Sequence, residues 1–190
     1  MAVRFCMKRI VLLLLVTSGL SACQPAPAPD LTIDDLLVLM RSRLEVMHDV
    51  ARWKWAARSP IEDPVREAAL LVEVAAQGKA LGLDPEATRA FFLGQIEAAK
   101  VVQKTDFRRW EEDQRGPEGK APDLASVLRP RIDALNRDLL SALARAGPRL
   151  RNKKVGAAAL IRRRADDLLN GNGIDGVVRD AAIRPLLDAS

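Results

Sequence analysis

The sequence predicts an all-α protein, and three features support this fold class. Apolar residues make up 48% of the 190 residues, but only 4% are aromatic and tyrosine is absent, whereas β-rich domains usually carry more aromatic and β-branched side chains. Apolar side chains recur every three or four positions over residues 36–54, which places them on one face of a helix. Asp63-Pro64 and Asp84-Pro85 each combine a capping acid with a proline in the first helical position, as helix starts do.

Residues 1–22 are predicted to be an export signal that is removed from the mature protein. Arg4, Lys8 and Arg9 form a basic start, and residues 10–16 (IVLLLLV) form an apolar stretch too short to span a bilayer. Removing these three cations lowers the net charge from +5 to +2. We therefore expect no nucleic-acid partner, because such partners require a stronger basic excess.

Cys23 is expected to be the first residue of the mature chain. Residues 20–23 (LSAC) resemble the lipobox of bacterial lipoproteins, which implies that Cys23 carries lipid and anchors the protein to a membrane. The alternative is an ordinary secreted protein in which Cys23 is incidental. Cys6 leaves with the signal, so no intrachain disulfide can form. Gln24 after the lipidated cysteine favours the outer membrane, and residues 23–30 supply a stiff, proline-rich tether.

A long first helix is expected from a cap at Asp30 or Thr32 to about Arg58, where Ser59-Pro60 stops it. A helix of this length is on the order of 40 Å long. Its inner stripe combines four apolar residues with two cations: Leu36, Met40, Arg43, Met47, Val50 and Lys54. A buried charge is costly unless it is paired, so the two cations predict an anion that meets them inside the protein.

Two more helices follow from the Asp-Pro starts. The second is expected from Asp63 to about Gly82, and the third from about Pro85 to Gln114, before the Gly-Pro at residues 116–117. The inner face of the third helix again places a polar residue among apolar ones: Phe92, Ile96, Ala99, Gln103, Phe107 or Asp106, and Trp110.

The fourth helix is expected to begin at the capping residue Asp123 and to end near Ala146, where Gly147-Pro148 breaks it. Pro130 either kinks this helix or marks its first turns. The apolar inner face is Leu128, Ile132, Leu135, Leu139 and Ala142.

The remaining chain is predicted to add two helices over residues 149–169 and 175–187, separated by the turn Asn-Gly-Asn-Gly at residues 170–173. We assign residues 31–146 to one domain and residues 147–190 to a C-terminal helical extension of that domain.

Several chemistries are excluded by composition. His48 is the only histidine, so neither a histidine-based metal cluster nor a Ser-His-Asp triad can be built. We interpret His48 as a surface or supporting residue rather than a catalyst, and no thiol nucleophile remains once Cys23 is acylated. The arginines at residues 162–164 are interpreted as a solvated helix face rather than a phosphate-binding patch. No metal or cofactor is expected.

Polar residues on the inner faces of four helices indicate a binding cavity. Such a cavity would contain three arginines, one lysine, one amide and two acids: Arg43, Lys54, Asp63, Arg66, Glu67, Gln103 and Arg129. This set suits a small dianion that also carries a hydroxyl group, because arginine binds a carboxylate through two hydrogen bonds. The alternative is a set of buried ion pairs, such as one between Arg43 and Glu67.

These residues lie in segments that resemble the AroQ-type chorismate mutases, specifically the secreted gamma subclass. The similar motifs are LMRSRLEVMHDVARWKW, PIEDPVRE, GLDP, FFLGQIEAAKVVQ and PDLASVLRPRIDALNRDLL, in this order over about residues 36–143. The spacings also agree: 11 residues from Arg43 to Lys54, 12 to Arg66 and 37 to Gln103. The resemblance implies an all-α bundle with a long first helix, the substrate chorismate, the product prephenate, no cofactor, and a homodimer with a complete site in each protomer.

Roles for single residues are also implied by the resemblance. Arg43 and Arg129 match the arginines that hold the substrate carboxylates, and Arg66 matches a further arginine of the site. Lys54 and Gln103 match the hydrogen-bond donors to the ether oxygen, and Lys54 also touches a carboxylate. The two acids, Asp63 and Glu67, match those near the ring hydroxyl.

Ala99 departs from the family pattern, since many relatives have serine or threonine there and so contact the ring carboxylate through a hydroxyl. Gln103, in place of an acid, predicts activity that does not need low pH, because an amide donates at any pH. The rival functions are an isochorismate–pyruvate lyase on the same fold and a non-catalytic lipoprotein that binds a small anion. The long ordered stripe carrying Lys54 favours the mutase over the lyase.

Overall fold

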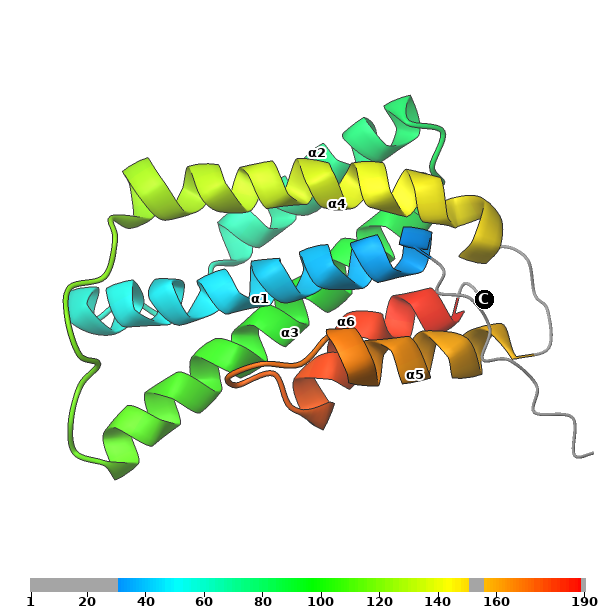
Figure 1. Cartoon of the computed structure of the whole chain (residues 1–190). Coiled ribbons are helices and arrows are strands. Elements are labelled where there is room, and N and C mark those ends of the chain that lie inside the picture. The colour runs from blue at the N-terminus through cyan, green and yellow to red at the C-terminus, as the bar shows by residue number, and fades with distance from the viewer. Residues whose placement is uncertain (1–30, 151–155, 189–190) are drawn as a thin grey trace, which may run out of the picture.

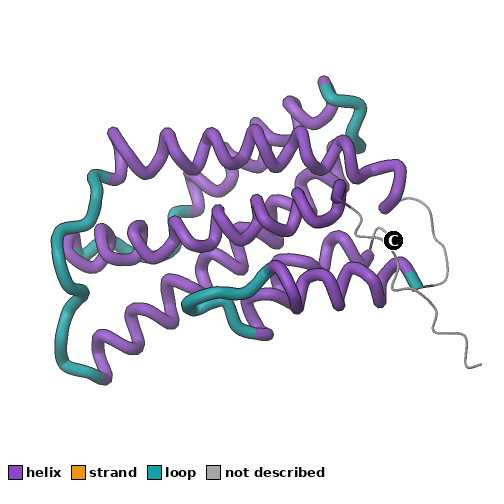
Figure 2. Tube along the Cα trace, viewed as in Figure 1, coloured by secondary structure: helices purple, strands orange, loops and turns teal. Residues whose placement is uncertain are grey.

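The computed structural model describes residues 31–150 and 156–188, and this part of the chain is helical, with one isolated bridge between Gly171 and Ile174. The helices are α1 (Leu31–Ala57), α2 (Pro64–Ala80), α3 (Pro85–Glu112), the short π-helix η1 (Leu124–Leu128), α4 (Arg129–Leu150), α5 (Ala157–Leu168) and α6 (Gly176–Asp188). Short loops join most of them (Figure 2). The predicted all-α class is confirmed, and none of the described helices combines the length and apolar character that a membrane crossing needs.

The export signal at residues 1–22, Cys23 and the tether lie outside the described residues. The assignments of a signal, a lipidated cysteine and a domain boundary at residue 31 therefore remain predictions.

Helix α1 lies at the centre of the bundle. It contacts α3, α4 and α5, while α2 packs against α3 and α4 (Figure 1). All six residues of its predicted stripe are at most 9% exposed, including the two cations Arg43 and Lys54. The helical spacing thus identified the buried face of α1 correctly.

The predicted helix starts are present with their caps. The Asp63 side chain accepts a hydrogen bond from the backbone N–H of Arg66, and Asp84 caps α3 in the same way. Asp123 accepts from the backbone N–H of Ser126 and so caps η1. Each acid satisfies one of the backbone donors that a helix start leaves without a partner.

On α3 the sequence left Phe107 and Asp106 as alternatives for the inner face. The structure places Asp106 inside, at 2% exposure, and leaves Phe107 partly exposed. Phe107 instead packs edge-on against Trp55 at a ring distance of 5.1 Å. A buried carboxylate requires partners, and Asp106 finds them in His48 and Arg109.

The predicted break at Gly147-Pro148 is wrong, because α4 continues to Leu150. Pro148 lies in the last turn, where its missing N–H removes only one helical hydrogen bond, and Leu150 is buried in the core. The fifth helix accordingly starts later than residue 149, at Ala157, after Gly156 with a φ of 100°. Pro130 lies in the first turn of α4, so it marks the beginning of this helix rather than a kink within it.

The C-terminal helices cover the bundle from the side opposite α4 (Figure 1). Helix α6 packs along α3, and α5 packs on α1 and α6. Arg164 of α5 forms a two-pronged ion pair with Asp34 at 2.8 and 2.5 Å, which ties the extension to the start of α1. Arg162 and Arg163 are exposed, in agreement with a solvated helix face.

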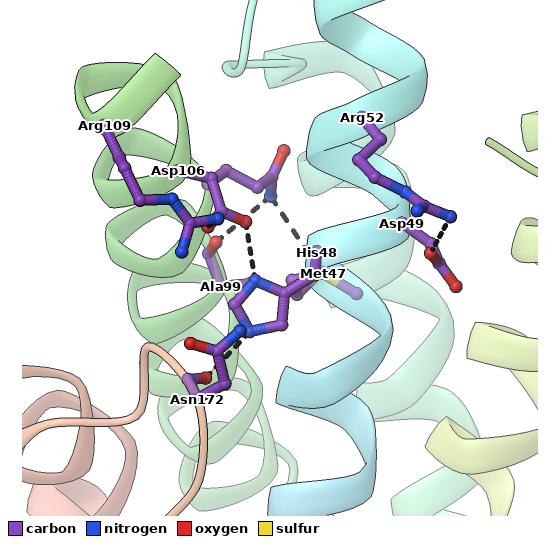
Figure 3. A network of polar contacts seen from close by, with 9 residues as sticks. Met47, His48, Asp49, Arg52, Ala99, Asp106, Arg109 and Asn172 are labelled. Atoms are coloured by element: carbon purple, nitrogen blue, oxygen red, sulfur yellow. Dashed lines mark hydrogen bonds and ion pairs between the residues drawn. The ribbon is translucent and has the colours of Figure 1, made fainter. Parts of the chain in front are cut away.

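His48 joins three segments that are far apart in the chain. Its Nδ1 lies 2.6 Å from Oδ2 of Asp106 on α3, and its Nε2 lies 2.8 Å from the backbone oxygen of Asn172 in the α5–α6 loop (Figure 3). Both ring nitrogens face acceptors, so only the imidazolium can donate to both. The hydrogen bond to Asp106 is the main cause that raises the pKa of His48, and burial, with a smaller effect from Arg109, opposes it.

We predict that this link makes part of the stability pH-dependent. Because the pKa of His48 is raised on folding from its ordinary 6.5, the stabilisation is complete below that value and is lost as the pH rises through the folded-state pKa. The melting temperature of the wild type should exceed that of His48→Gln by about 2–4 °C below pH 6, if the hydrogen bond contributes on the order of 1 kcal/mol. Thermal melts from pH 5 to 9 measure the difference, which should shrink with rising pH; a constant difference would contradict the prediction.

Candidate active site

One cavity between α1, α2, α3 and α4 is lined by all seven residues that the sequence singled out: Arg43, Lys54, Asp63, Arg66, Glu67, Gln103 and Arg129. Ala99 lines the same cavity, and Met47, Val50 and Ile96 give it an apolar wall. Helical spacing selected Arg43, Lys54 and Gln103, and the helix starts together with the family resemblance selected the other four. His48 belongs to a different surface, on the side of Asp106 and Asn172.

Arg43 is a buried cation without a carboxylate partner among the described residues. Its Nε donates to Oδ1 of Asn136 at 3.0 Å and its Nη1 to the backbone oxygen of Gln95 at 3.1 Å, both neutral acceptors. The alternative of an Arg43–Glu67 ion pair is therefore wrong. Burial lowers the pKa of Arg43 to about 10, so the guanidinium stays charged at neutral pH while its charge is left uncompensated.

Lys54 extends from the last turn of α1 into the same cavity. Its Nζ donates to the backbone oxygen of Ile61 in the α1–α2 loop. Burial lowers the pKa of Lys54, and the charges of Asp63 and Glu67 oppose that shift. The ammonium group therefore sits where additional negative charge would stabilise it.

The first turn of α2 supplies three charged residues, and each has a defined contact. Oε1 of Glu67 accepts from the backbone N–H of Asp63 at 3.2 Å, while its Oε2 pairs with Lys100 at 2.8 Å. Arg66 pairs with Asp133 of α4 at 2.9 Å. These contacts hold the side chains of this turn at the edge of the cavity.

Gln103 lies on α3, buried opposite α1. Its Nε2 donates to the backbone oxygen of Ala99 at 3.1 Å and lies 3.9 Å from the sulfur of Met47. The Nε2 contacts are thus a backbone oxygen and a sulfur, while Oε1 of Gln103 is buried without a hydrogen-bond partner among the described residues. Arg129, at the start of α4, is exposed at the rim.

Three polar lining residues were missed by the sequence analysis: Lys100, Asp133 and Asn136. Asn136 carried a usable signal. It lies four residues after Ile132 and three before Leu139 on the inner face of its helix, and is 4% exposed. The same reasoning that selected Gln103 would have selected it. Lys100 and Asp133 lie at the margins of their apolar faces, where spacing gives no signal.

The charges of the lining match a dianion. Five cations (Arg43, Lys54, Arg66, Lys100 and Arg129) stand against three acids (Asp63, Glu67 and Asp133), an excess of two positive charges. Two of the acids already pair with Arg66 and Lys100, so the uncompensated charge concentrates at Arg43, Lys54 and Arg129. Within the described residues, no group of three or more His, Cys, Asp or Glu side chains gathers as a metal site.

Comparison with known proteins gives a consistent result. Residues 32–104 match the family model for chorismate mutase type II. The chain is 30% identical to the secreted chorismate mutase of Mycolicibacterium smegmatis over 174 residues, which is 88% of this chain and 94% of that protein. It is also 32% identical to the secreted chorismate mutase of Mycobacterium tuberculosis over 109 residues, covering 57% of this chain and 54% of that one.

A solved structure agrees with the sequence comparison. The crystal structure of a chorismate mutase from Burkholderia thailandensis superposes with a TM-score of 0.75 at 38% identity, covering 85% of this chain and 100% of that chain. The helical arrangement found here, including the C-terminal extension, is thus shared over most of the described chain.

Proposed function

Since this chain belongs to the chorismate mutase family, we propose that it converts chorismate to prephenate in the cavity described above. The observation that supports this function most directly is the excess of two positive charges in a cavity whose buried arginine has only neutral acceptors. Chorismate is a dianion with a ring hydroxyl, and the lining offers cations for its carboxylates and acids for its hydroxyl.

The reaction is a [3,3] rearrangement within one molecule. A carbon–oxygen bond breaks while a carbon–carbon bond forms, and no proton, electron or group passes to the protein. The enzyme must hold the substrate in a compact, chair-like conformer, and its contribution is orientation together with preorganised electrostatics. We assign the carboxylates to Arg43 and Arg129, with Arg66 as a further cation of the site.

Lys54 and Gln103 are proposed to act where charge develops. As the ether bond breaks, negative charge grows on its oxygen, and donors already aimed at that atom stabilise the transition state more than the substrate. The Nζ of Lys54 comes from the end of α1, and the Nε2 of Gln103 comes from α3 beside Met47. Both donors are anchored to backbone oxygens, which limits the reorganisation they need.

Asp63 and Glu67 are proposed to receive the ring hydroxyl. Glu67 is oriented by Lys100 and by the backbone N–H of Asp63, so its carboxylate has a fixed position before the substrate arrives. The ion pair of Lys100 with Glu67 also raises the pKa of Lys100 and keeps that lysine charged.

The rival functions differ at identifiable points. A lyase acting on isochorismate would release pyruvate. Lys54 lies here in the last turn of α1, within the ordered stripe, and this position favours the mutase over the lyase. A non-catalytic anion-binding lipoprotein would bind chorismate without turnover. Incubating the purified protein with chorismate or isochorismate, and measuring prephenate and salicylate, separates the three.

We further propose that the protein is exported and anchored by lipid on Cys23, in the outer membrane, and that it forms a homodimer. The relatives above are named secreted, which supports export, and the LSAC motif at residues 20–23 supports lipidation. Sedimentation of the purified protein tests the dimer, which a monomer at micromolar concentration would contradict.

Removing a donor or cation of the site should impair catalysis strongly. We expect Arg43→Ala, Lys54→Ala and Gln103→Ala each to lower kcat/KM by about 10² or more, the usual cost of one such donor. Lys79→Ala, at an exposed lysine near the end of α2, is the matched control and should have the activity of the wild type. Rates close to the wild type in all three site variants would refute the assigned roles.

The pH profile should show an alkaline limb to which Lys54 and Arg43 both contribute, and no acidic requirement from Gln103. Because burial lowers the pKa of Lys54 from its ordinary 10.5, kcat/KM should begin to fall at a pH below 10.5 as the pH is raised. A bound dianion stabilises the ammonium group, so the corresponding fall in kcat should occur at higher pH. Gln103→Glu should instead become more active as the pH falls, since a carboxyl donates only when protonated. Identical profiles for Gln103→Glu and the wild type would contradict the donor role.

Lipidation predicts a change in both processing and location. Cys23→Ser should abolish lipid attachment and release the protein from the membrane fraction, as measured by intact mass and fractionation in a bacterial host. A Cys23→Ser protein that is still membrane-bound and still processed before residue 23 would rule out lipidation at Cys23.

A further inference from the structure

Asn136 occupies a position in the cavity that neither the sequence motifs nor the assigned roles explain. It lies on α4, is 4% exposed, and lines the same cavity as Arg43 and Ala99. Its Oδ1 accepts from Nε of Arg43 at 3.0 Å. A guanidinium can only donate, so the amide oxygen must face Arg43 and the amide nitrogen must point elsewhere. The orientation of this side chain is thereby determined.

The Nδ2 of Asn136 is buried and has no hydrogen-bond partner among the described residues. Buried polar groups nearly always have partners, and an unsatisfied donor is costly. Asn136 lines a cavity whose charges favour a dianion, and its amide N–H groups have no acceptor among the described residues. An oxygen atom of a bound ligand could accept a hydrogen bond from the Nδ2 of Asn136.

Arg43 offers a donor on the same side. Its Nε and Nη1 already contact Asn136 and the backbone of Gln95, and no described residue accepts from Nη2. In the fixed geometry of a guanidinium, Nε and Nη2 point to the same side, so Nη2 lies next to the amide of Asn136. A carboxylate oxygen placed there can accept from both side chains.

We propose that Asn136 is a substrate-binding residue whose amide N–H donates to the carboxylate that Arg43 holds, in place of the hydroxyl that Ala99 lacks. The inference rests on the proposed function. An amide is suited to this place because it accepts from Arg43 through one atom and donates to the substrate through the other. One side chain thus fixes the guanidinium and supplies the missing donor without adding a charge.

The first variant is Asn136→Asp, tested in the full-length protein. Aspartate keeps the shape and the oxygen that accepts from Arg43, but replaces the N–H by an anionic oxygen facing the substrate. We expect KM for chorismate, and the dissociation constant measured by calorimetry with prephenate, to rise by about 10- to 10²-fold, as for loss of a hydrogen bond to a charged group. We expect kcat to change less, and the thermal melt to show a folded protein.

Ser141→Asp adds the same charge to the exposed face of α4 and is the matched control, expected to match the wild type. Aspartate at residue 136 would still accept from the guanidinium of Arg43 but would also offset part of its charge, so the positioning role is separated by the comparison of Asn136→Ala with and without Ala99→Ser. Binding by Asn136→Asp within twofold of the wild type would overturn the proposal.

A second pair of variants tests the link to Ala99. Asn136→Ala should raise KM by about 10-fold or more, and adding Ala99→Ser should recover part of the loss. Absence of recovery would overturn the assignment of both positions to one carboxylate. A wild-type protein that neither binds nor converts chorismate would instead refute the proposed function, so the two failures are distinguishable.

Discussion

A guanidinium that is buried without a carboxylate is the constraint on which this site depends. Removing Arg43 from water is costly, and among the described residues only the neutral acceptors of Asn136 and Gln95 offset that cost. A partner acid within the bundle would have made Arg43 more stable and unavailable. The structure keeps the acids of the cavity occupied elsewhere, Glu67 with Lys100 and Asp133 with Arg66, so the charge of Arg43 remains directed at a ligand.

The helices around α1 serve this arrangement in different ways. Helix α1 carries Arg43 and Lys54 three turns apart on one buried stripe, which sets the length of the cavity. The first turn of α2 supplies polar groups because its capping acid begins the helix there. Helices α3 and α4 contribute single amides, Gln103 and Asn136, at positions otherwise filled by apolar residues. The site therefore consists of polar side chains at positions that face the core, and the apolar residues beside each of them hold it in place.

The C-terminal extension stabilises the back of the bundle, away from the cavity. Arg164 binds Asp34 at one end of α1, and the loop before α6 meets His48 (Figure 3). His48 follows Met47, and Asp106 comes one turn after Gln103, so the imidazolium joins α1 to α3 directly behind two cavity residues. A single histidine that composition marked as unsuitable for catalysis thus acts as a structural bridge.

The sequence by itself determined the all-α class, the starts of α2 and α3 and the buried face of α1, because helical spacing and aspartate caps are local properties. It also singled out seven lining residues: Arg43, Lys54 and Gln103 as polar groups in apolar stripes, and the other four from their places at helix starts and from the family resemblance. It misjudged the end of α4, where burial of Leu150 outweighs the cost of Pro148. Only the tertiary structure decided which charges pair and which stay free: Glu67 meets Lys100 rather than Arg43, and the amide of Asn136 is left with a free donor. Those outcomes depend on distances across helices, which no local pattern encodes.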